Sequence, residues 1–128
     1  MAKKKVLVTG AAGRIGRLAR SYLGEKYELS GLDLLEVEDI ESHVADLADL
    51  DAIRPAFEGK DTVLHLGGDP RAEAPFDSVV RNNIIGTHNV FEASREAGVG
   101  RVVFASTNHV VGYYPEKEEP YKAVFEGR

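Results

Sequence analysis

Three glycines spaced three residues apart, Gly10, Gly13 and Gly16, lie where a short apolar run ends and a helical pattern begins. Glycine at these positions allows a tight reversal, close approach of the backbone to a bulky anion, and close packing of a helix on a strand. The first amides of a helix have no partner within it, and its dipole places partial positive charge beside them. The stretch therefore predicts a pyrophosphate site, to which Arg14 and Ile15 also belong. A glycine-rich turn that only caps a helix is the alternative.

An acidic residue, Asp33, ends the second apolar run, seventeen positions after Gly16. In nucleotide-binding α/β sheets this position faces the adenosine ribose, where a carboxylate accepts hydrogen bonds from both hydroxyl groups. The same charge repels a 2′-phosphate, and the following Leu34 and Leu35 provide no cation to offset it. The sequence therefore favours NAD over NADP as the cofactor. If Asp33 were a solvated turn residue, the choice between the two would stay open.

Two further strand ends carry candidate cofactor contacts. Asp46 follows a short third run, where its carboxylate would accept a hydrogen bond from the adenine amine while Leu47 covers the ring. Capping of the next helix is the competing role for Asp46. The fourth run ends in Leu66, Gly67 and Gly68. The small residues would let the cofactor lie against bare backbone, although glycine also ends strands that bind nothing.

A polar cluster follows the fifth apolar run, with Ala105, a predicted cofactor contact, at its start and Thr107, Asn108 and His109 within it. Ligands of open α/β sheets bind at the carboxyl ends of the strands, so the chemistry is predicted here. Ser, Thr and Asn are also ordinary turn residues, which is the alternative. No oriented His–acid pair accompanies the cluster, which disfavours a nucleophilic hydroxyl. Another histidine, His65, stands at a strand end and is expected to be structural.

Apolar runs alternate with helical patterns, which predicts a parallel sheet with helical crossovers on both faces. With the glycine turn after the first strand, the natural strand order is 3-2-1-4-5, the Rossmann-type doubly wound α/β fold. The first helix should carry Ile15, Leu18, Ala19, Tyr22 and Leu23 on one face. The expected strands are 6–8, 27–32, 43–45, 61–66 and 101–105, and the expected helices are about 13–24, 49–57 with Asp49 as its cap, and 77–97.

The composition is that of one domain: 128 residues, 43% of them hydrophobic, with a net charge of -5. The acidic balance and the lack of a basic cluster argue against nucleic acid as a partner. No apolar stretch is long enough to span a bilayer and no signal peptide is recognisable, so a cytoplasmic protein without a membrane partner is expected. The absence of Cys excludes disulfides and thiolate ligands, and with no His-x-x-x-His spacing a metal site is not expected.

The motifs above are joined by a further one at residues 83–87 on the expected long helix. Residues 9–16, 33, 46–47, 65–68, 83–87 and 104–109 together resemble, in order, the motifs of the extended short-chain dehydrogenases/reductases, the NAD-dependent epimerase/dehydratase family. Within that family, residues 65–71 and 105–112 look most like uronate dehydrogenases, and equally like the NAD-dependent sugar dehydrogenases that oxidise glucose 6-phosphate.

The resemblance implies hydride transfer between C1 of a sugar and NAD. Thr107 aligns with the family's catalytic Ser/Thr, which hydrogen-bonds the reacting oxygen. Asn108 and His109 align with residues that hold the sugar, and Asp69 occupies a loop position that touches substrate in relatives. Asn83 belongs to a motif that ties the long helix to the active-site region.

The family's general base, a Tyr with a Lys four residues later on a helix, has no convincing counterpart. Tyr113 and Lys117 have the spacing, but they follow Thr107 too closely and Pro115 between them opposes a helix. The chain is therefore expected to be a C-terminally truncated NAD-binding domain over 1–112, followed by an irregular tail at 113–128.

Three functions remain open at this point. A sugar dehydrogenase that is inactive as this truncated chain is the favoured one. The alternatives are an NAD-dependent nucleotide-sugar epimerase or dehydratase, and a non-catalytic module that binds a nucleotide or a protein partner. A homo-oligomer formed through an exposed sheet edge or through helices is a further expectation.

Overall fold

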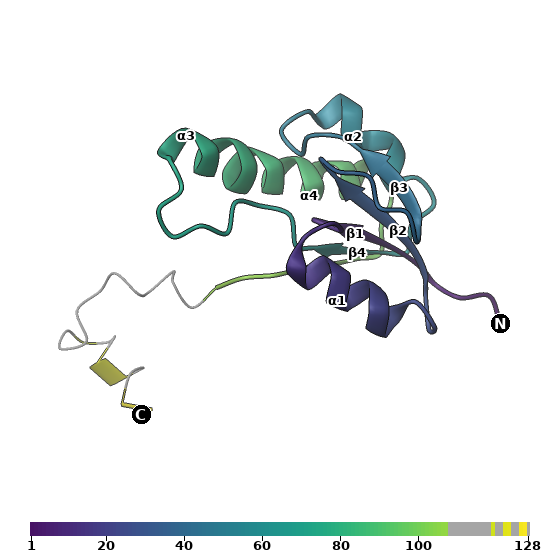
Figure 1. The fold of residues 1–128 in the computed structure, drawn as a ribbon, viewed down its shortest axis with the longest axis horizontal. Helices are drawn as coiled ribbons and strands as arrows, with labels where there is room; N and C mark the ends of the chain where they lie inside the picture. Colours follow the sequence, from purple (N-terminus) through teal and green to yellow (C-terminus); the bar gives the residue numbers. More distant parts are fainter. Residues whose placement is uncertain (108–118, 120–121, 124–125, 128) are drawn as a thin grey trace.

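The computed structural model describes residues 1–107, 119, 122–123 and 126–127. Within them strands and helices alternate along the chain (Figure 1). The strands are β1 Lys5–Thr9, β2 Glu28–Asp33, β3 Glu41–Val44, β4 Thr62–His65 and β5 Arg101–Phe104, and the helical segments are α1 Arg14–Leu23, α2 Leu50–Phe57, α3 Phe76–Ser78, the π-helical η1 Val79–Ile85 and α4 Gly86–Glu96.

The strands form one parallel sheet in the order β3-β2-β1-β4-β5. Figure 1 shows α1 on one face of this sheet and α2 with α4 on the other. The predicted doubly wound Rossmann-type sheet, with strand order 3-2-1-4-5, is thus confirmed. The order reverses between β1 and β4, where successive crossovers leave on opposite faces and a crevice opens at the carboxyl ends of the strands.

The central strand β1 contributes to two hydrophobic cores, because successive side chains of a strand point to opposite faces. Leu7 packs into the core beneath α2 and α4, which includes the fully buried Phe57 and Val90. Val6 and Val8 belong to the smaller core on the α1 side. The sheet is therefore held by a larger core on the α2–α4 face than on the α1 face.

Helix α1 lies closer to the sheet than its apolar pattern predicts. Gly16 is its buried residue, and a Cβ at this position would lie 2.3 Å from the carbonyl oxygen of Gly10. Because the helix contacts the glycine turn through Gly16, several of its larger apolar side chains do not face the sheet. Ile15, Leu18 and Tyr22 are exposed by 58%, 51% and 76%, respectively. The helical face expected from the sequence exists, but much of it lies at the surface.

The long helix expected over 77–97 is present at 76–96, but its middle is π-helical. A π turn carries its hydrogen bonds to the fifth residue rather than the fourth, which shifts the helical face. Val90 and Ala93 are buried, whereas Ile84 and Phe91 are exposed by 59% and 46%. A 3.6-residue periodicity applied across the whole segment therefore mixes two faces.

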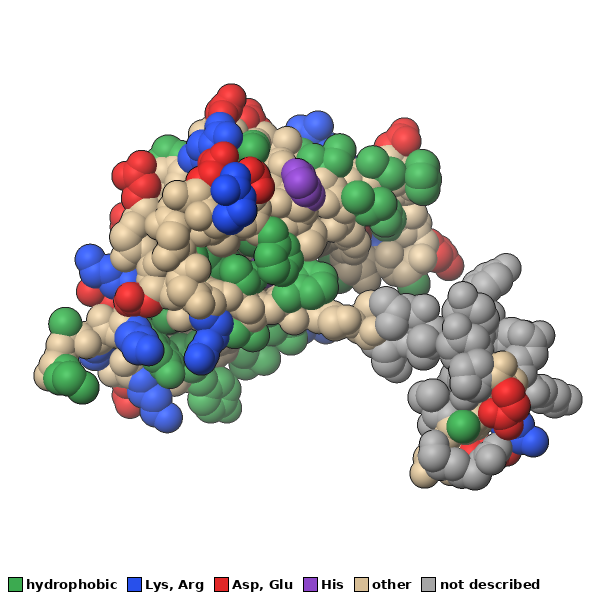
Figure 2. Space-filling model, turned by 180° about the vertical axis from the view of Figure 1, so that it is seen from behind, with side chains coloured by type: hydrophobic (Ala, Val, Ile, Leu, Met, Phe, Trp, Pro, Cys, Tyr) green, Lys and Arg blue, Asp and Glu red, His purple; other side chains and the backbone are tan. Residues whose placement is uncertain are grey.

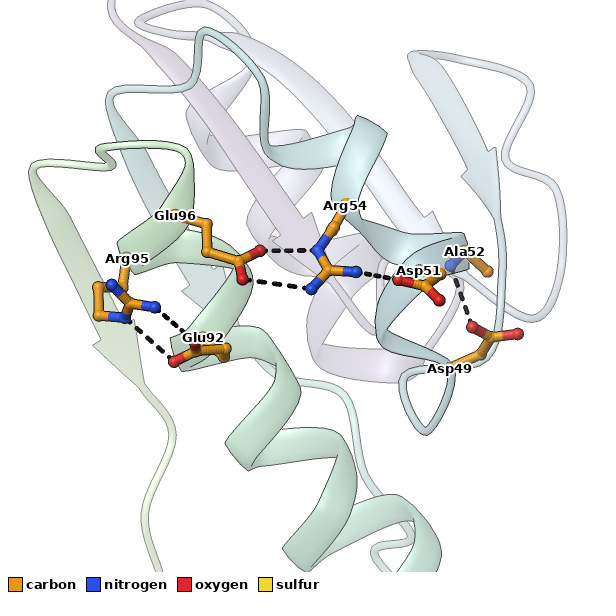
Figure 3. Close-up of polar contacts among 7 residues, drawn as sticks. All are labelled: Asp49, Asp51, Ala52, Arg54, Glu92, Arg95 and Glu96. Atoms are coloured by element: carbon orange, nitrogen blue, oxygen red, sulfur yellow. Dashed lines mark hydrogen bonds and ion pairs between the residues drawn. The ribbon is translucent and has the colours of Figure 1, made fainter.

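Helices α2 and α4 are joined by charged side chains on their outer surface (Figure 3). The Arg54 guanidinium donates to both carboxylate oxygens of Glu96, with Nε–Oε2 and Nη2–Oε1 distances of 2.7 and 3.2 Å, and also pairs with Asp51. Asp49 caps α2 as predicted, because its carboxylate accepts from the amide of Ala52 at 3.1 Å. These contacts fix the two helices relative to each other above the larger core.

One edge strand of the sheet, β5, carries apolar side chains at the surface. Val103 and Phe104 are exposed by 46% and 49%, and the Phe104 ring meets that of Phe91 edge-on at 6.3 Å. Figure 2 shows hydrophobic side chains on this side of the molecule, near the segment that leads to the grey residues. Among the described residues, no helix has the length and apolar character that crossing a membrane requires.

Replacement of Gly16 by Ala should lower the free energy of unfolding by about 2 kcal/mol or more, because the new Cβ would collide with backbone oxygens of Gly10 and Ala11. Gly100→Ala is the matched control, since the nearest atom to its Cβ would be the Asp61 carbonyl oxygen at 3.5 Å, an ordinary contact. Urea unfolding followed by circular dichroism measures both variants. Equal losses of stability would contradict the close approach of α1 to the turn.

Candidate functional site

A cavity of about 760 Å³ opens at the carboxyl ends of β1, β2, β3 and β4. Four separate segments meet there: the turn between β1 and α1, the end of β2, the residues after β3 and those after β4. Of the predicted cofactor residues, the cavity is lined by Gly10, Gly13, Arg14, Ile15, Gly16, Asp33, Asp46, Leu47, Leu66, Gly67 and Gly68. The remaining one, Ala105, does not line it, and its amide donates to the carbonyl oxygen of His65.

The glycine turn brings two strand ends into direct backbone contact. Gly10 has a φ of 69°, and a Cβ on it would lie 2.8 Å from the amide nitrogen of Gly67. Its own amide donates to Leu32 at 2.9 Å. No residue with a side chain fits Gly10 without displacing the strand end after β4. The predicted tight reversal therefore also sets the distance between the two sides of the cavity.

The first turn of α1 presents free donors to the cavity. Gly13 is the N-cap, and the amide of Arg17 makes the helical hydrogen bond to the Gly13 carbonyl oxygen. Helix geometry leaves the amides of Arg14, Ile15 and Gly16 without a carbonyl partner in the preceding turn. No acidic residue stands in this first turn. The helix N-terminus is thus an electropositive site suited to an anion.

Asp33, at the end of β2, lines the same cavity as the start of α1. One carboxylate oxygen accepts from the amide of Ala12 at 3.0 Å, and the other accepts from the amide of Leu35 at 3.2 Å. The carboxylate is therefore fixed between the glycine turn and the loop after β2. Each oxygen can still accept a second hydrogen bond, because a carboxylate has about four acceptor sites.

Asp46 is held by a partner that sequence reasoning missed. Its Oδ1 accepts from the amide of Ala48 at 2.8 Å, and its Oδ2 accepts from Arg81 of η1 at 2.7 Å. These contacts, the Ala48 amide first, hold the pKa of Asp46 below its ordinary value. Helix capping, the competing role considered for Asp46, falls to Asp49 instead. Asp46 lines the cavity beside Leu47, which packs close to Gly67.

The loop after β4 is hydrogen-bonded to the π-helical segment and to α3. Asn83 accepts from the amide of Asp69 at 2.6 Å and donates to its carbonyl oxygen at 3.0 Å. The Asp69 carboxylate accepts from Arg71 and from the hydroxyl of Ser78. Arg71 first, and then Ser78, hold the pKa of Asp69 well below its ordinary value. Asn83 does tie the helix to the loop, whereas the roles of Arg71 and Ser78 had no signal in the sequence.

His65 lies beneath the cavity rather than in it. It is 1% exposed, with Nδ1 2.6 Å from the Thr9 hydroxyl oxygen and Nε2 3.0 Å from that of Thr87. Its ring stacks on Phe104 with 5.5 Å between centroids. Burial lowers the pKa of His65 to about 4, so the ring is neutral at pH 7. A structural role, as expected, agrees with this position.

The structure describes only some of the residues predicted to contact the substrate. Thr107 is the last residue of the continuous described stretch, and it is exposed. Asn108, His109 and the Tyr113–Lys117 pair lie outside the described residues. Within the part of the chain that the structure describes, no group of three His, Cys, Asp or Glu side chains could hold a metal ion.

Together the reversal of strand order, the bare glycine turn, the free helix amides and the fixed Asp33 carboxylate define a nucleotide-binding α/β protein. A dinucleotide fits the residues present, because side chains are lacking where a pyrophosphate would approach the backbone. The chain matches the NAD dependent epimerase/dehydratase family over residues 6–125, and it belongs to that family. The expected cofactor, NAD, is the one for which this family is named.

Similar proteins include several sugar dehydrogenases. The chain is 45% identical over 118 residues to an NAD-dependent glucose-6-phosphate dehydrogenase of Haloferax volcanii, covering 85% of this chain and 45% of that protein. It is 43% identical over 120 residues to a uronate dehydrogenase of Agrobacterium fabrum, covering 90% and 45%. A crystal structure of uronate dehydrogenase from Agrobacterium tumefaciens, a mutant complexed with NAD, superposes with a TM-score of 0.81 at 43% identity, covering 91% and 46%. The chain thus spans less than half the length of these relatives.

Stability should fall between pH 7 and pH 5 because of His65. Its folded-state pKa of about 4 lies below the ordinary 6.5, so the unfolded chain binds the proton first as the pH falls. This contribution to stability is present above about pH 6.5, and between pH 7 and 5 about 2 kcal/mol of it should be lost. Urea unfolding at the two pH values measures the loss. His65→Gln should reduce the difference; a difference that His65→Gln does not reduce would contradict the assignment.

Proposed function

We propose that the chain is the NAD-binding part of a sugar oxidoreductase that transfers hydride from C1 of a hexuronate or sugar phosphate to NAD. Residues 1–112 are proposed as the nucleotide-binding domain, and 113–128 as an irregular tail. The observation that carries the proposal is the cavity that is lined both by the N-terminus of α1 and by Asp33, whose carboxylate the Ala12 amide fixes. Family membership and the names of the similar sugar dehydrogenases support it.

In this proposal the pyrophosphate binds at the amides of Arg14, Ile15 and Gly16, with Gly10 and Gly13 leaving room for it. Asp33 accepts hydrogen bonds from the adenosine ribose. Bound NAD supplies the hydride acceptor. On the adenine side, Asp46 accepts from the amine, and its own position is kept by Arg81 and Ala48. The strand end with Leu66, Gly67 and Gly68 closes the other side of the site.

The charge around Asp33 supports NAD rather than NADP. Its carboxylate would lie where NADP carries its 2′-phosphate, and two like charges there repel each other. Leu34 and Leu35, both lining the cavity, follow it without a basic residue. No described salt bridge involves Asp33, so its charge is not neutralised by a cation of this chain within the described residues.

On the substrate side, Thr107 is proposed to hydrogen-bond the reacting oxygen, and Asp69, Asn108 and His109 to hold the sugar. Oxidation at C1 also requires a base for the hydroxyl proton as the hydride leaves for the cofactor. The Tyr–Lys pair that performs this step in the family has no convincing counterpart in the sequence given. The 128 residues are therefore proposed to bind NAD without catalysing turnover.

Two other functions have specific support. The family as described includes epimerases and dehydratases, and a structure of MoeE5 in complex with UDP-glucuronic acid and NAD matches with 32% identity and a TM-score of 0.73. Binding of a protein partner, or self-association, is favoured by the exposed Val103 and Phe104 on the edge strand β5.

Replacement of Asp33 by Asn should weaken NADH binding about tenfold, since hydrogen bonds from the ribose to a charged acceptor are worth about 1.5 kcal/mol or more. The same change should improve NADPH binding, because the repulsion of its 2′-phosphate is removed. Fluorescence titration with each nucleotide measures both effects. Glu36→Gln, which removes a nearby charge outside the cavity, is the control. Unchanged binding of both nucleotides by Asp33→Asn would refute the ribose assignment.

The purified 128-residue chain should bind NADH but produce none from NAD with galacturonate, glucuronate or glucose 6-phosphate. Absorbance at 340 nm detects the product, and NADH fluorescence with the same preparation shows whether the nucleotide site is formed. The physical reason is that the sequence has no convincing counterpart of the Tyr–Lys pair that takes the C1 hydroxyl proton in the family. Turnover at rates typical of enzymes, about 1 per second or faster, would contradict the proposed inactivity.

A further inference from the structure

A buried chain of hydrogen bonds runs beneath the cavity from β1 through β4 to α4. It joins the side chains of Thr9, His65 and Thr87, which do not themselves line the cavity. Thr9 and His65 are also paired across the β1–β4 ladder, so their positions are set by the register of the sheet. The dinucleotide site assigns no role to these three residues.

The direction of each hydrogen bond in this chain follows from the donors around Thr9. Its hydroxyl oxygen lies 3.2 Å from the amide nitrogens of both Leu66 and Gly67. An amide can only donate, so the oxygen accepts two hydrogen bonds and both its lone pairs are used. Its single proton is then directed to Nδ1 of His65, 2.6 Å away. The amide of Leu66 is shared with the carbonyl oxygen of Thr9, also at 3.2 Å.

The same reasoning fixes the tautomer of His65. An Nδ1 that accepts from Thr9 carries no proton, so the proton of the neutral ring is on Nε2. That nitrogen lies 3.0 Å from the hydroxyl oxygen of Thr87, which accepts. Burial of the ring favours the neutral form. A ring with its proton on Nδ1 would face the Thr9 proton and would require the hydroxyl to turn away.

The two amides that donate hydrogen bonds to the Thr9 hydroxyl oxygen belong to residues of the cavity wall. Leu66 and Gly67 line it directly, and they lie so close to Gly10 that a Cβ on Gly10 would collide with their backbone. The Thr9 hydroxyl therefore decides where the strand end lies relative to the glycine turn. A displacement there changes the width of the site that the cofactor must enter.

We propose that His65 is a positioning residue, which as the Nε2–H tautomer accepts a hydrogen bond from the Thr9 hydroxyl at Nδ1 and so directs the Thr9 oxygen to the Leu66 and Gly67 amides, holding this strand end at the distance from Gly10 that NAD requires. The assignment rests on the proposed NAD site. His65 does not touch the nucleotide and acts only through Thr9.

The test compares Thr9→Val, which keeps the shape of the side chain but removes the hydroxyl, with Thr9→Ser, which keeps the hydroxyl. NADH fluorescence titration should show binding weakened about tenfold in Thr9→Val and changed less than about twofold in Thr9→Ser. Thr87→Val is the control for a merely structural role. It removes the last acceptor of the same chain, so it should lower the urea midpoint but weaken NADH binding less than about threefold.

Nitrogen-15 NMR of the histidine side chains reads the tautomer directly in the wild-type chain, with the His65 signals identified by their loss in His65→Gln. The expected pattern is a protonated Nε2 and an unprotonated Nδ1 at pH 7. A protonated Nδ1 would overturn the proposal, even if Thr9→Val failed to fold. Binding losses that simply follow the urea midpoints of Thr9→Val and Thr87→Val would also overturn it. If wild type binds NADH and Thr9→Val binds equally well, the positioning role alone fails; if wild type does not bind, the NAD site fails with it.

Discussion

The backbone contact between Gly10 and Gly67 is the constraint on which the rest of the site depends. It joins the ends of β1 and β4, the two strands between which the sheet reverses its order, and it leaves no space for a Cβ on Gly10. On one side of this contact the chain enters α1 and presents free amides. On the other side it continues into the loop held by Asn83. Both walls of the nucleotide cavity are thus positioned from one point of closest approach.

The support around this contact is uneven. Beneath α2 and α4 the sheet has a continuous core, strengthened on the surface by the Arg54–Glu96 pair. On the other face α1 approaches through Gly16, and the apolar side chains of Ile15, Leu18 and Tyr22 stay at the surface. Parallel sheets are normally covered on both faces. Within the described residues the sheet is therefore packed more extensively beneath α2 and α4 than beneath α1, and its β5 edge is exposed.

Much of the fold could be predicted because its signals are local. The glycine spacing, the position of Asp33 and the alternation of strands with helices are all visible in short windows, and right-handed crossovers then leave few strand orders. The exposure of α1 could not be predicted from periodicity, because it depends on how closely Gly16 approaches the turn. The π-helical segment likewise has no signature in its apolar pattern.

The polar partners of the site were the least predictable. Arg81 reaches Asp46 across 35 positions of sequence, and Thr9 reaches His65 across 56. Such pairs exist only once the register of the sheet and the phase of the helices are set. Asn83 was the exception, because the resemblance to a family pointed to it while its hydrogen bonds to Asp69 came from the structure.

The π-helical segment between α3 and α4 has one more consequence. Asn83 and Ser78 contact the loop after β4, whereas Val90 and Ala93, further along the same continuous helix, are anchored in the core. The wider turn between them accommodates one residue more than a regular helix would. The π turn changes the helical phase between the two ends of the helix. The end that binds the loop and the end that packs in the core can therefore each face their own contacts. Deletion of a single residue within Val79–Ile85 would force these two ends into a common phase, so that one set of contacts could be kept only at the expense of the other.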